Sequence, residues 1–328
     1  MVYLTKMKLK GLSAYLQEKK HIPALANIDG DREKIVKDCI FITARYRTGS
    51  TYLYSLFSSL ANTIAFYEPL NYHVLDWLEK DDLEHQKTQL WLSHNLQDGY
   101  FYEYKSLERE VLTKYFKRKF GIERMVLSAT EDHSELKDYL NFLLSTYPQK
   151  LKVLQFNRID FRLAWIKANF PGALIVNLRR NPRDIYASFV GLYLRSGNGD
   201  RTNLNDGIEK VIDFVGLNEE LNALSEVSVP QFSLHDLNSY EKIYLLNQLS
   251  HQWSDQFADL VLEYEALIQD PVGELSKIIS HIPKFELKFS GEMPKPRKDR
   301  INVWQEYHPE IWFQECEVKC NSLLEKHF

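Results

Sequence analysis

Short apolar runs of strand length recur along the chain, and the stretches between them carry apolar residues at helical spacing. The runs are continuous and rich in β-branched and aromatic residues, which is typical of strands buried on both faces of a parallel sheet. They cover residues 39–44, 63–67, 152–156, 173–178 and 260–264. Strands that alternate with helices in this way predict an α/β fold, in which helices flank a central parallel sheet.

The segments 74–150 and 190–255 are mainly helical in pattern and rich in Trp, Tyr and Phe. We expect them to be helical cap insertions on the sheet, so that residues 1–328 form a single domain with one substantial core. The stretch 194–207 combines Gly, Asn and Asp, which predicts a loop. The core strands fall within residues 39–67, 152–180 and 259–264.

The charge balance is mildly acidic, with 41 Lys and Arg against 45 Asp and Glu. A general nucleic-acid-binding protein would normally have an excess of basic residues, so the composition argues against that class. Two local basic clusters, at 178–183 and 295–300, suit a small polyanion instead. No stretch approaches 18 uninterrupted apolar residues and no signal peptide is evident, so we expect no membrane span and a cytoplasmic protein.

Three cysteines are too few for a disulfide framework in 328 residues. Cys316 and Cys320 are one helical turn apart, but no His or Cys cluster nearby completes a zinc site. We therefore expect three reduced thiols, with Cys39 in the core.

The stretch CIFITARYRTGSTYLYSLF, residues 39–57, contains an apolar strand, a short polar loop and a helix that begins with Ser50 and Thr51. A helix N-terminus offers unpaired backbone N–H groups and a partial positive charge, so this arrangement predicts a phosphate site. The nucleoside-triphosphate loop G-x-x-x-x-G-K-[ST] is incomplete here. When Gly49 and Thr51 are aligned with its second Gly and its Ser or Thr, Ser50 occupies the lysine position and Ala44 that of the first Gly.

Polar and charged residues follow each predicted strand. Ligands of open parallel sheets bind beyond the carboxyl ends of the strands, so these residues should converge on one cleft. Ser188 lies eight residues after Arg180, on a helix begun at Pro182, and the pair is placed to grip one phosphate. The post-strand residues are Arg47 to Thr51, Glu68, His73, Asn157, Arg158 and the segment 179–188.

Three motifs, in this order, resemble the sulfotransferases that use 3′-phosphoadenosine 5′-phosphosulfate (PAPS). The first is Arg47-Thr48-Gly49-Ser50-Thr51, and the second is Arg180 with Ser188 within FPGALIVNLRRNPRDIYAS. The third is HQWSDQFADLVLEYEALIQDP, residues 251–271, a Trp-bearing helix that leads to a strand and turn. Together they span residues 39–271.

The resemblance implies a P-loop-type fold and PAPS as the sulfuryl donor, with no metal required. It implies that Arg47 points at the bridging oxygen and sulfuryl group, and that an arginine fork can bind them bidentately. The backbone N–H groups of residues 48–51, with the hydroxyls of Ser50 and Thr51, would hold the 5′-phosphate.

The 3′-phosphate would be held by Arg180 and Ser188. The C-terminal KPRKDRINVWQEYHPE is similar to the basic closing loop of the family. In that resemblance Arg297 and Arg300 contact the 3′-phosphate, and Trp304 packs on the loop.

Sulfuryl transfer also needs a base to accept the proton of the acceptor hydroxyl. Family members that act on phenols and steroids use a histidine after the third strand, where this chain has Asn157 and Arg158. Members that act on sugars often carry a carboxylate after the second strand, and FYEPLNYH resembles that setting. Glu68 is therefore the candidate base and His73 the second choice.

The resemblance leaves the acceptor open. A hydroxyl of a carbohydrate or glycosylated metabolite is our first expectation, and a lipid or polyketide hydroxyl is the alternative. A P-loop nucleotide kinase would need the lysine that Ser50 replaces, and a non-catalytic PAPS-binding protein is the remaining reading. Aromatic residues in 72–104 suit sugar-stacking platforms or, more simply, the core of the cap. They include Trp77, Trp91, Tyr100, Phe101, Tyr102 and Tyr104.

Overall fold

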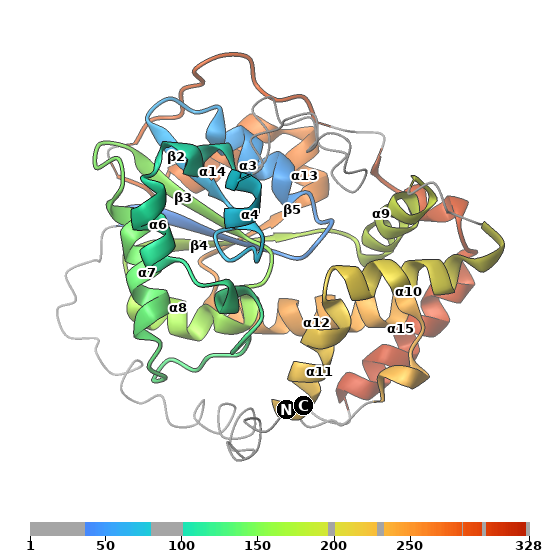
Figure 1. Cartoon of the computed structure of the whole chain (residues 1–328). Coiled ribbons are helices and arrows are strands. Elements are labelled where there is room, and N and C mark those ends of the chain that lie inside the picture. The colour runs from blue at the N-terminus through green and yellow to red at the C-terminus, as the bar shows by residue number, and fades with distance from the viewer. Residues whose placement is uncertain are drawn as a thin grey trace, which may run out of the picture.

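The computed structural model describes residues 37–79, 101–195, 201–227, 233–283, 285–296 and 300–325. Its centre is a five-stranded sheet in the order β2-β3-β1-β4-β5, in which every neighbouring pair is parallel (Figure 1). The predicted α/β fold is confirmed. The strands are β1 (Cys39–Ala44), β2 (Thr63–Tyr67), β3 (Leu151–Phe156), β4 (Ala173–Arg179) and β5 (Leu260–Glu263).

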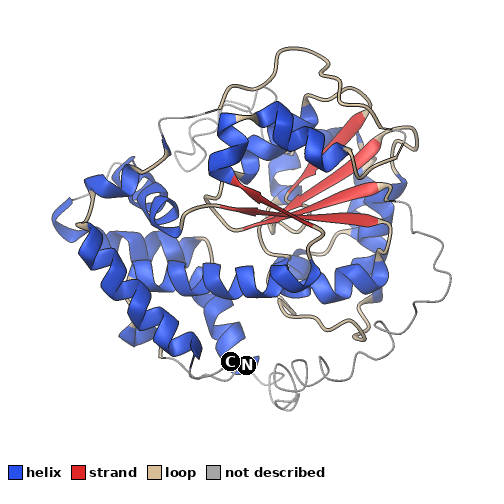
Figure 2. Ribbon diagram, turned by 180° about the vertical axis from the view of Figure 1, so that it is seen from behind, coloured by secondary structure: helices blue, strands red, loops and turns tan. Residues whose placement is uncertain are grey.

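Strand β1 occupies the middle of the sheet, where all six of its residues are buried. Phe41 lies beside Leu154 of β3 and Ile175 of β4, so apolar side chains continue across the sheet. Helices cover both faces, with α3, α13 and α14 on one and α8 and α12 on the other (Figures 1 and 2). Burial on both sides explains the continuous apolar runs in the sequence.

The predicted helical segments are helical in their described parts. Helix α12 begins with a capping box, in which the Asn238 side chain accepts from the Glu241 N–H and the Glu241 carboxylate accepts from the Asn238 N–H. The helices are α3 (Ser50–Ser58), α4 (Val74–Glu79), α6 (Arg109–Tyr115), α7 (Ser134–Ser145), α8 (Leu163–Asn169), α9 (Pro182–Arg195), α10 (Leu204–Phe214), α11 (Leu217–Val227), α12 (Ser239–Phe257), α13 (Tyr264–Gln269), α14 (Pro271–Ile279) and α15 (Glu310–Glu325).

A second apolar cluster, separate from that around the sheet, lies among α9, α10, α11, α12 and α15. Its aromatic centre includes Tyr240 and Phe313, whose ring centroids are 4.8 Å apart in an edge-to-face arrangement. Helix α9 follows β4 directly, so this helical group is attached at the carboxyl end of the sheet (Figure 1). The assignment of the whole chain to one domain stays a prediction.

The loop predicted for 194–207 is wrong in its last part, because α10 already begins at Leu204. Gly207 contributed to that prediction as a turn residue. In the structure it lies in α10 against the ring of Tyr193, and a Cβ there would come within 2.1 Å of a ring atom. This glycine permits the close approach of α10 to α9 rather than a turn. Residues 196–200 lie outside the described part.

All three cysteines are buried and free, and Cys39 lies in the sheet core as expected. Within the described ranges, no helix is both long enough and apolar enough to cross a membrane. In the same ranges no group of three or more His, Cys, Asp or Glu side chains is arranged to hold a metal ion.

Candidate functional site

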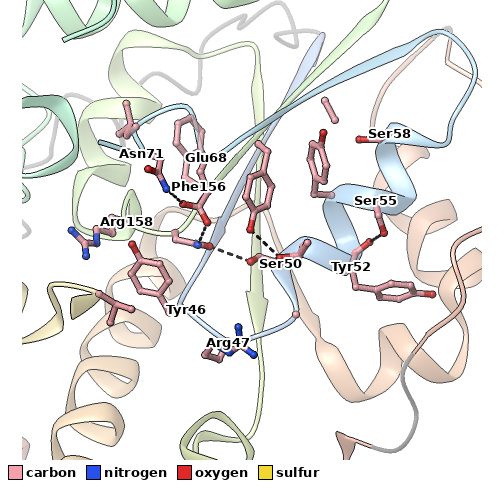
Figure 3. Close-up of a pocket in the computed structure, with 18 of the residues that line it drawn as sticks. Tyr46, Arg47, Ser50, Tyr52, Ser55, Ser58, Glu68, Asn71, Phe156 and Arg158 are labelled. Atoms are coloured by element: carbon pink, nitrogen blue, oxygen red, sulfur yellow. Dashed lines mark hydrogen bonds between the residues drawn. The ribbon is translucent and has the colours of Figure 1, made fainter. Parts of the chain in front are cut away.

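A cavity of 2290 Å³ opens beyond the carboxyl ends of the strands (Figure 3). Residues predicted from four different strand ends line it, so the sheet brings them together as expected. Thr48 does not line the cavity, and Arg297 lies outside the described residues. The predicted residues that line it are Arg47, Gly49, Ser50, Thr51, Glu68, His73, Asn157, Arg158, Arg180, Ser188 and Arg300.

The loop after β1 is anchored by a buried ion cluster that the sequence analysis missed. Arg45 donates to both carboxylate oxygens of Glu220 at 2.7 and 2.6 Å and to Asp160 at 3.0 and 3.2 Å. Its carbonyl oxygen accepts from the Thr48 hydroxyl at 2.8 Å, which closes the turn. These contacts join residues 115 and 175 positions apart, and they fix the loop from both sides.

Gly49 is the position at which the loop enters α3. Its φ of 96° lies in the left-handed region, and a Cβ here would come within 2.3 Å of the Tyr264 ring. Both the backbone conformation and the close contact therefore require glycine. Tyr264 belongs to the third sequence motif, so the first and third motifs meet at this point.

The N-terminus of α3 faces the cavity with unpaired donors. The N–H groups of Gly49, Ser50 and Thr51 donate to no acceptor in the part of the chain that the structure describes. The Ser50 hydroxyl donates to Oδ1 of Asn157 at 3.1 Å, and the Thr51 hydroxyl lies 2.9 Å from that of Tyr67. Three N–H groups at a helix N-terminus form a ready site for an anion.

Arg47, Arg180 and Ser188 meet at one edge of the cavity. Arg47 has a φ of 69°, and its Nε donates to the Ser188 hydroxyl at 2.8 Å. Arg180 donates to the carbonyl oxygens of Arg47, at 2.9 Å, and of Arg300, at 2.5 Å. Its guanidinium lies 4.6 Å from the centroid of the Tyr264 ring. Ser188 thus contacts Arg47, while Arg180 joins the first loop to the C-terminal segment.

Among the described residues Arg180 forms no ion pair with a carboxylate, and its hydrogen bonds go to main-chain oxygens. Its Nε is buried and has no acceptor among the described residues. Burial lowers the pKa of Arg180, since the charged form loses solvation. An anion bound beside Arg180 would replace the solvation that the charged guanidinium loses on burial.

Asp184 holds the C-terminal segment against α9. Its buried carboxylate accepts from the N–H groups of Asn302, at 2.8 Å, and Trp304, at 3.3 Å. Trp304 is buried, and its ring lies 4.8 Å from the Arg183 guanidinium. These contacts bring Arg300 to the cavity. The packing of Trp304 on this segment was expected from the sequence, whereas the part of Asp184 in holding it was not.

Glu68 follows β2 and is almost fully buried. Its carboxylate accepts from the side-chain amides of Asn71, at 2.7 Å, and Asn157 (Figure 3). Burial raises the pKa of Glu68, although hydrogen bonds from Asn71 and Tyr67 and the charge of Arg158 partly oppose the shift. Asn157 also accepts from Ser50, so one amide joins the carboxylate to the N-terminus of α3.

His73 lies at an exposed part of the cavity wall, with 58% of its side chain accessible. Its Nδ1 is 2.9 Å from Oδ2 of Asp76. Arg118 in turn forms a two-fold ion pair with Asp76. The ring of His73 is therefore paired with the carboxylate of Asp76 at the surface.

A second buried carboxylate, which the sequence analysis did not identify, supports β2 beneath the site. Glu103 accepts from the Tyr54 hydroxyl at 2.9 Å and from the Tyr67 backbone N–H. Burial raises the pKa of Glu103 to about 7. Since Tyr67 also contacts Thr51, Glu103 is linked through one residue to the N-terminus of α3.

The aromatic residues predicted in the cap divide into two groups. Phe101 and Tyr104 are buried in the core, whereas Tyr102 is 53% exposed and lines the cavity. The side chain of Trp77, together with Trp91 and Tyr100, lies outside the described residues.

The sequence profile of the sulfotransferase family matches residues 39–283. The chain belongs to this family. Among curated proteins, none matches the sequence significantly. Since the family is one of enzymes that transfer sulfuryl groups, the match decides against the nucleotide-kinase alternative.

Solved sulfotransferase structures are similar to this chain at low identity. A sulfotransferase domain from the curacin biosynthetic pathway is 15% identical, with 88% of this chain and 98% of that chain covered and a TM-score of 0.47. A sulfotransferase from Alicyclobacillus acidocaldarius is 13% identical, with 89% and 97% covered and a TM-score of 0.41. A mouse sulfotransferase solved in complex with PAP is 11% identical, with 88% of both chains covered and a TM-score of 0.39.

Proposed function

We propose that this enzyme transfers the sulfuryl group of PAPS to a hydroxyl of a carbohydrate or glycosylated metabolite. The observation that carries the proposal is the convergence of three kinds of group on one cavity. They are the unpaired N–H donors at the start of α3, the cations Arg47 and Arg180, and the buried carboxylate of Glu68. Sulfuryl transfer needs an anion cradle, leaving-group stabilisation and a base, and these groups supply all three.

The donor fits the edge of the cavity formed by β1 and β4. The N–H groups of Gly49 to Thr51 would hold the 5′-phosphate, as in other anion sites at helix N-termini. Arg180 and Ser188, with Arg300 brought close by Asp184, would hold the 3′-phosphate. The unpartnered Nε of Arg180 supports this assignment, because a buried donor without an acceptor is costly.

Arg47 would stabilise the leaving side of the reaction. In a loose in-line transfer, negative charge accumulates on the oxygen that the departing sulfuryl group leaves. Ser188 would position the Arg47 guanidinium by accepting from its Nε at 2.8 Å. Removal of one such donor typically lowers the rate about 100-fold or more, which corresponds to about 3 kcal/mol.

Glu68 would accept the proton of the acceptor hydroxyl. A general base works best when its pKa lies near the operating pH, and burial moves the pKa of Glu68 in that direction. Asn71 and Asn157 fix the orientation of its carboxylate. Because Asn157 also contacts Ser50, the base and the phosphate cradle share one hydrogen-bonded network.

Backbone strain at Arg47 and Glu68 supports the assignment of both residues to the active site. Arg47 and Glu68 have φ values of 69° and 41°, in the left-handed region that residues other than glycine rarely adopt. Each such conformation costs about 1–3 kcal/mol and persists where the surrounding structure enforces it, often at active sites. Glu68 directly follows β2, and Arg47 lies in the short loop between β1 and α3.

One observation favours the alternative acceptor, a hydroxyl on a lipid or polyketide chain. Four large apolar or aromatic side chains are more than 40% exposed and line the cavity. Ile122 and Phe214, at 51% and 68%, would suit an alkyl chain, whereas two tyrosines would also suit a sugar ring. The four are Tyr72, Tyr102, Ile122 and Phe214.

The proposal is tested by sulfuryl transfer from radiolabelled PAPS to a panel of simple glycosides and long-chain hydroxy compounds. We expect Glu68→Gln to lower kcat about 100-fold or more with unchanged affinity for 3′-phosphoadenosine 5′-phosphate. His73→Gln serves as the comparison and should keep most of the activity. If Glu68→Gln turns over at a near-wild-type rate, Glu68 is not the base. If His73→Gln loses the activity instead, His73 is the base.

A further inference from the structure

Arg158 lines the cavity but has no part in the reaction described above. It follows Asn157 directly at the end of β3, and its guanidinium lies 5.2 Å from the centroid of the Tyr46 ring (Figure 3). The backbone of Gly216, in the turn between α10 and α11, closes on the same group. A Cβ at Gly216 would come within 2.7 Å of Nη2 of Arg158. Two separate loops therefore enclose this side chain.

The fold provides few acceptors for the five N–H donors of this guanidinium. Nη1 is 3.5 Å from the carbonyl oxygen of Gly121, which is at the limit of a hydrogen bond. Nε is buried and has no acceptor within the described ranges. In the same ranges, no carboxylate forms an ion pair with Arg158.

Other arginines near the site are well satisfied. Arg162 donates to three main-chain oxygens at 2.7–3.0 Å, and Arg45 forms two buried ion pairs. Arg118 also stacks on a tyrosine, Tyr72, with 5.0 Å to the ring centroid, but Asp76 engages it in a two-fold ion pair. Arg158 therefore differs from these three arginines, whose guanidinium groups find acceptors or carboxylates within the fold.

The surroundings keep Arg158 charged. Its burial acts to lower the pKa, but Tyr46, Glu220 and Glu68 together raise it above the ordinary arginine value. Glu220 is already committed to Arg45. A charged, positioned and mostly unsatisfied guanidinium at a cavity wall has the properties of an anion-binding group.

We propose that Arg158 binds a carboxylate of the acceptor, so that the acceptor is a hydroxy acid rather than a neutral alcohol. This inference rests on the proposed function, because it places the carboxylate beside the reacting hydroxyl. Arg158 adjoins Asn157, the residue that holds the Glu68 carboxylate, so the bound acid would orient the hydroxyl toward the base. A planar carboxylate matches the arginine fork with two parallel hydrogen bonds, and Tyr46 and Gly216 enclose the fork.

The test uses matched probes in which only the acid group differs. Wild-type protein saturated with 3′-phosphoadenosine 5′-phosphate is titrated with methyl glucuronide and methyl glucoside. A second pair is 3-hydroxydecanoate and its methyl ester. We expect the acid of at least one pair to bind about tenfold or more tightly than its neutral counterpart, since bidentate arginine–carboxylate pairs are among the stronger hydrogen-bonded contacts.

Variants assign any preference to Arg158. Arg158→Met should bind each acid and its neutral counterpart about equally, and Arg158→Lys, which keeps the charge without the fork, should retain only part of the preference. Arg118→Met is the matched control, since it removes a stacked arginine that is already paired, and it should keep the full preference. Thermal unfolding and nucleotide titration of each variant report on folding and on the donor site.

Three results would overturn the inference. They are the absence of an acid preference in both pairs, a preference that survives Arg158→Met, and a tenfold loss of nucleotide affinity in a folded Arg158→Met, which would assign the group to the donor. Failure of the proposed function gives a different result, namely a wild-type protein that does not bind the nucleotide.

Discussion

The buried carboxylate of Glu103 should make the stability of the protein depend on pH. Glu103 is 6% exposed, in the short helix η2 (Tyr102–Ser106) that packs on β2. Burial raises the pKa of Glu103 from 4.5 to about 7. Below pH 4.5 the carboxyl is protonated in both the folded and the unfolded chain, and its contribution to stability is fully present.

As the pH rises from about 4.5 to about 7, the unfolded chain loses the proton of Glu103 while the folded protein retains it. Stability is therefore lost across this window, and the loss is complete above the folded pKa. Each unit of pKa difference corresponds to about 1.4 kcal/mol, so ionisation of Glu103 costs about 3 kcal/mol of unfolding free energy by pH 8.

The assay is urea unfolding of the wild type and Glu103→Gln at pH 4.5 and pH 8. The difference between the two proteins isolates this one group, because all other titrating residues are shared. Glutamine cannot ionise, so the variant should gain about 3 kcal/mol relative to the wild type between the two pH values. Tyr54→Phe removes a donor that favours the ionised form and should shift the wild-type transition to higher pH. If the difference in unfolding free energy between Glu103→Gln and the wild type is the same at pH 4.5 and pH 8, the reasoning is refuted.

Two further substitutions test the loop after β1. Gly49→Ala should abolish nucleotide binding and destabilise the protein by more than the roughly 1 kcal/mol that the left-handed backbone alone costs, because of the Tyr264 contact. Gly291→Ala, where a Cβ meets nothing within 4 Å, is the control. If both variants lower the unfolding free energy and the nucleotide affinity equally, Gly49 has no special role in the loop. Arg45→Met should lower the unfolding free energy by about 3–5 kcal/mol, since it leaves Glu220 and a second carboxylate buried without their cation. If the unfolding free energy of Arg45→Met lies within about 1 kcal/mol of the wild-type value, the ion cluster does not hold the loop.

Much of the sheet could be predicted from the sequence because four of its five strands, β1 to β4, are buried on both faces. Burial of every residue of β1 requires an unbroken apolar run, and such a run is visible without any knowledge of its neighbours. The positions of Arg47, Glu68 and Arg180 could be predicted from the positions of these strands. Each comes just after a strand, and parallel strands end at one edge.

The pairing of side chains within the site could not be predicted in this way. Periodicity gives no sign that Arg45 pairs with Glu220, or that Asp184 holds the segment around Asn302, because these contacts join distant parts of the chain. Gly207 illustrates the limit of local signals, since glycine serves close helix packing as well as turns. A buried carboxylate such as Glu103 looks like any other Glu in the sequence.

Calorimetric titration with 3′-phosphoadenosine 5′-phosphate, compared with ATP and magnesium, shows whether this cavity binds the sulfuryl donor. We expect tight binding of the bisphosphate that does not depend on magnesium. Arg180→Ala should weaken that binding about tenfold or more, because the substitution removes a cation from the 3′-phosphate site. Ser188→Ala should weaken binding less, since it removes a neutral hydroxyl. Preference for magnesium-ATP, or bisphosphate binding that is unchanged in Arg180→Ala, would contradict the assignment of this cavity to the sulfuryl donor.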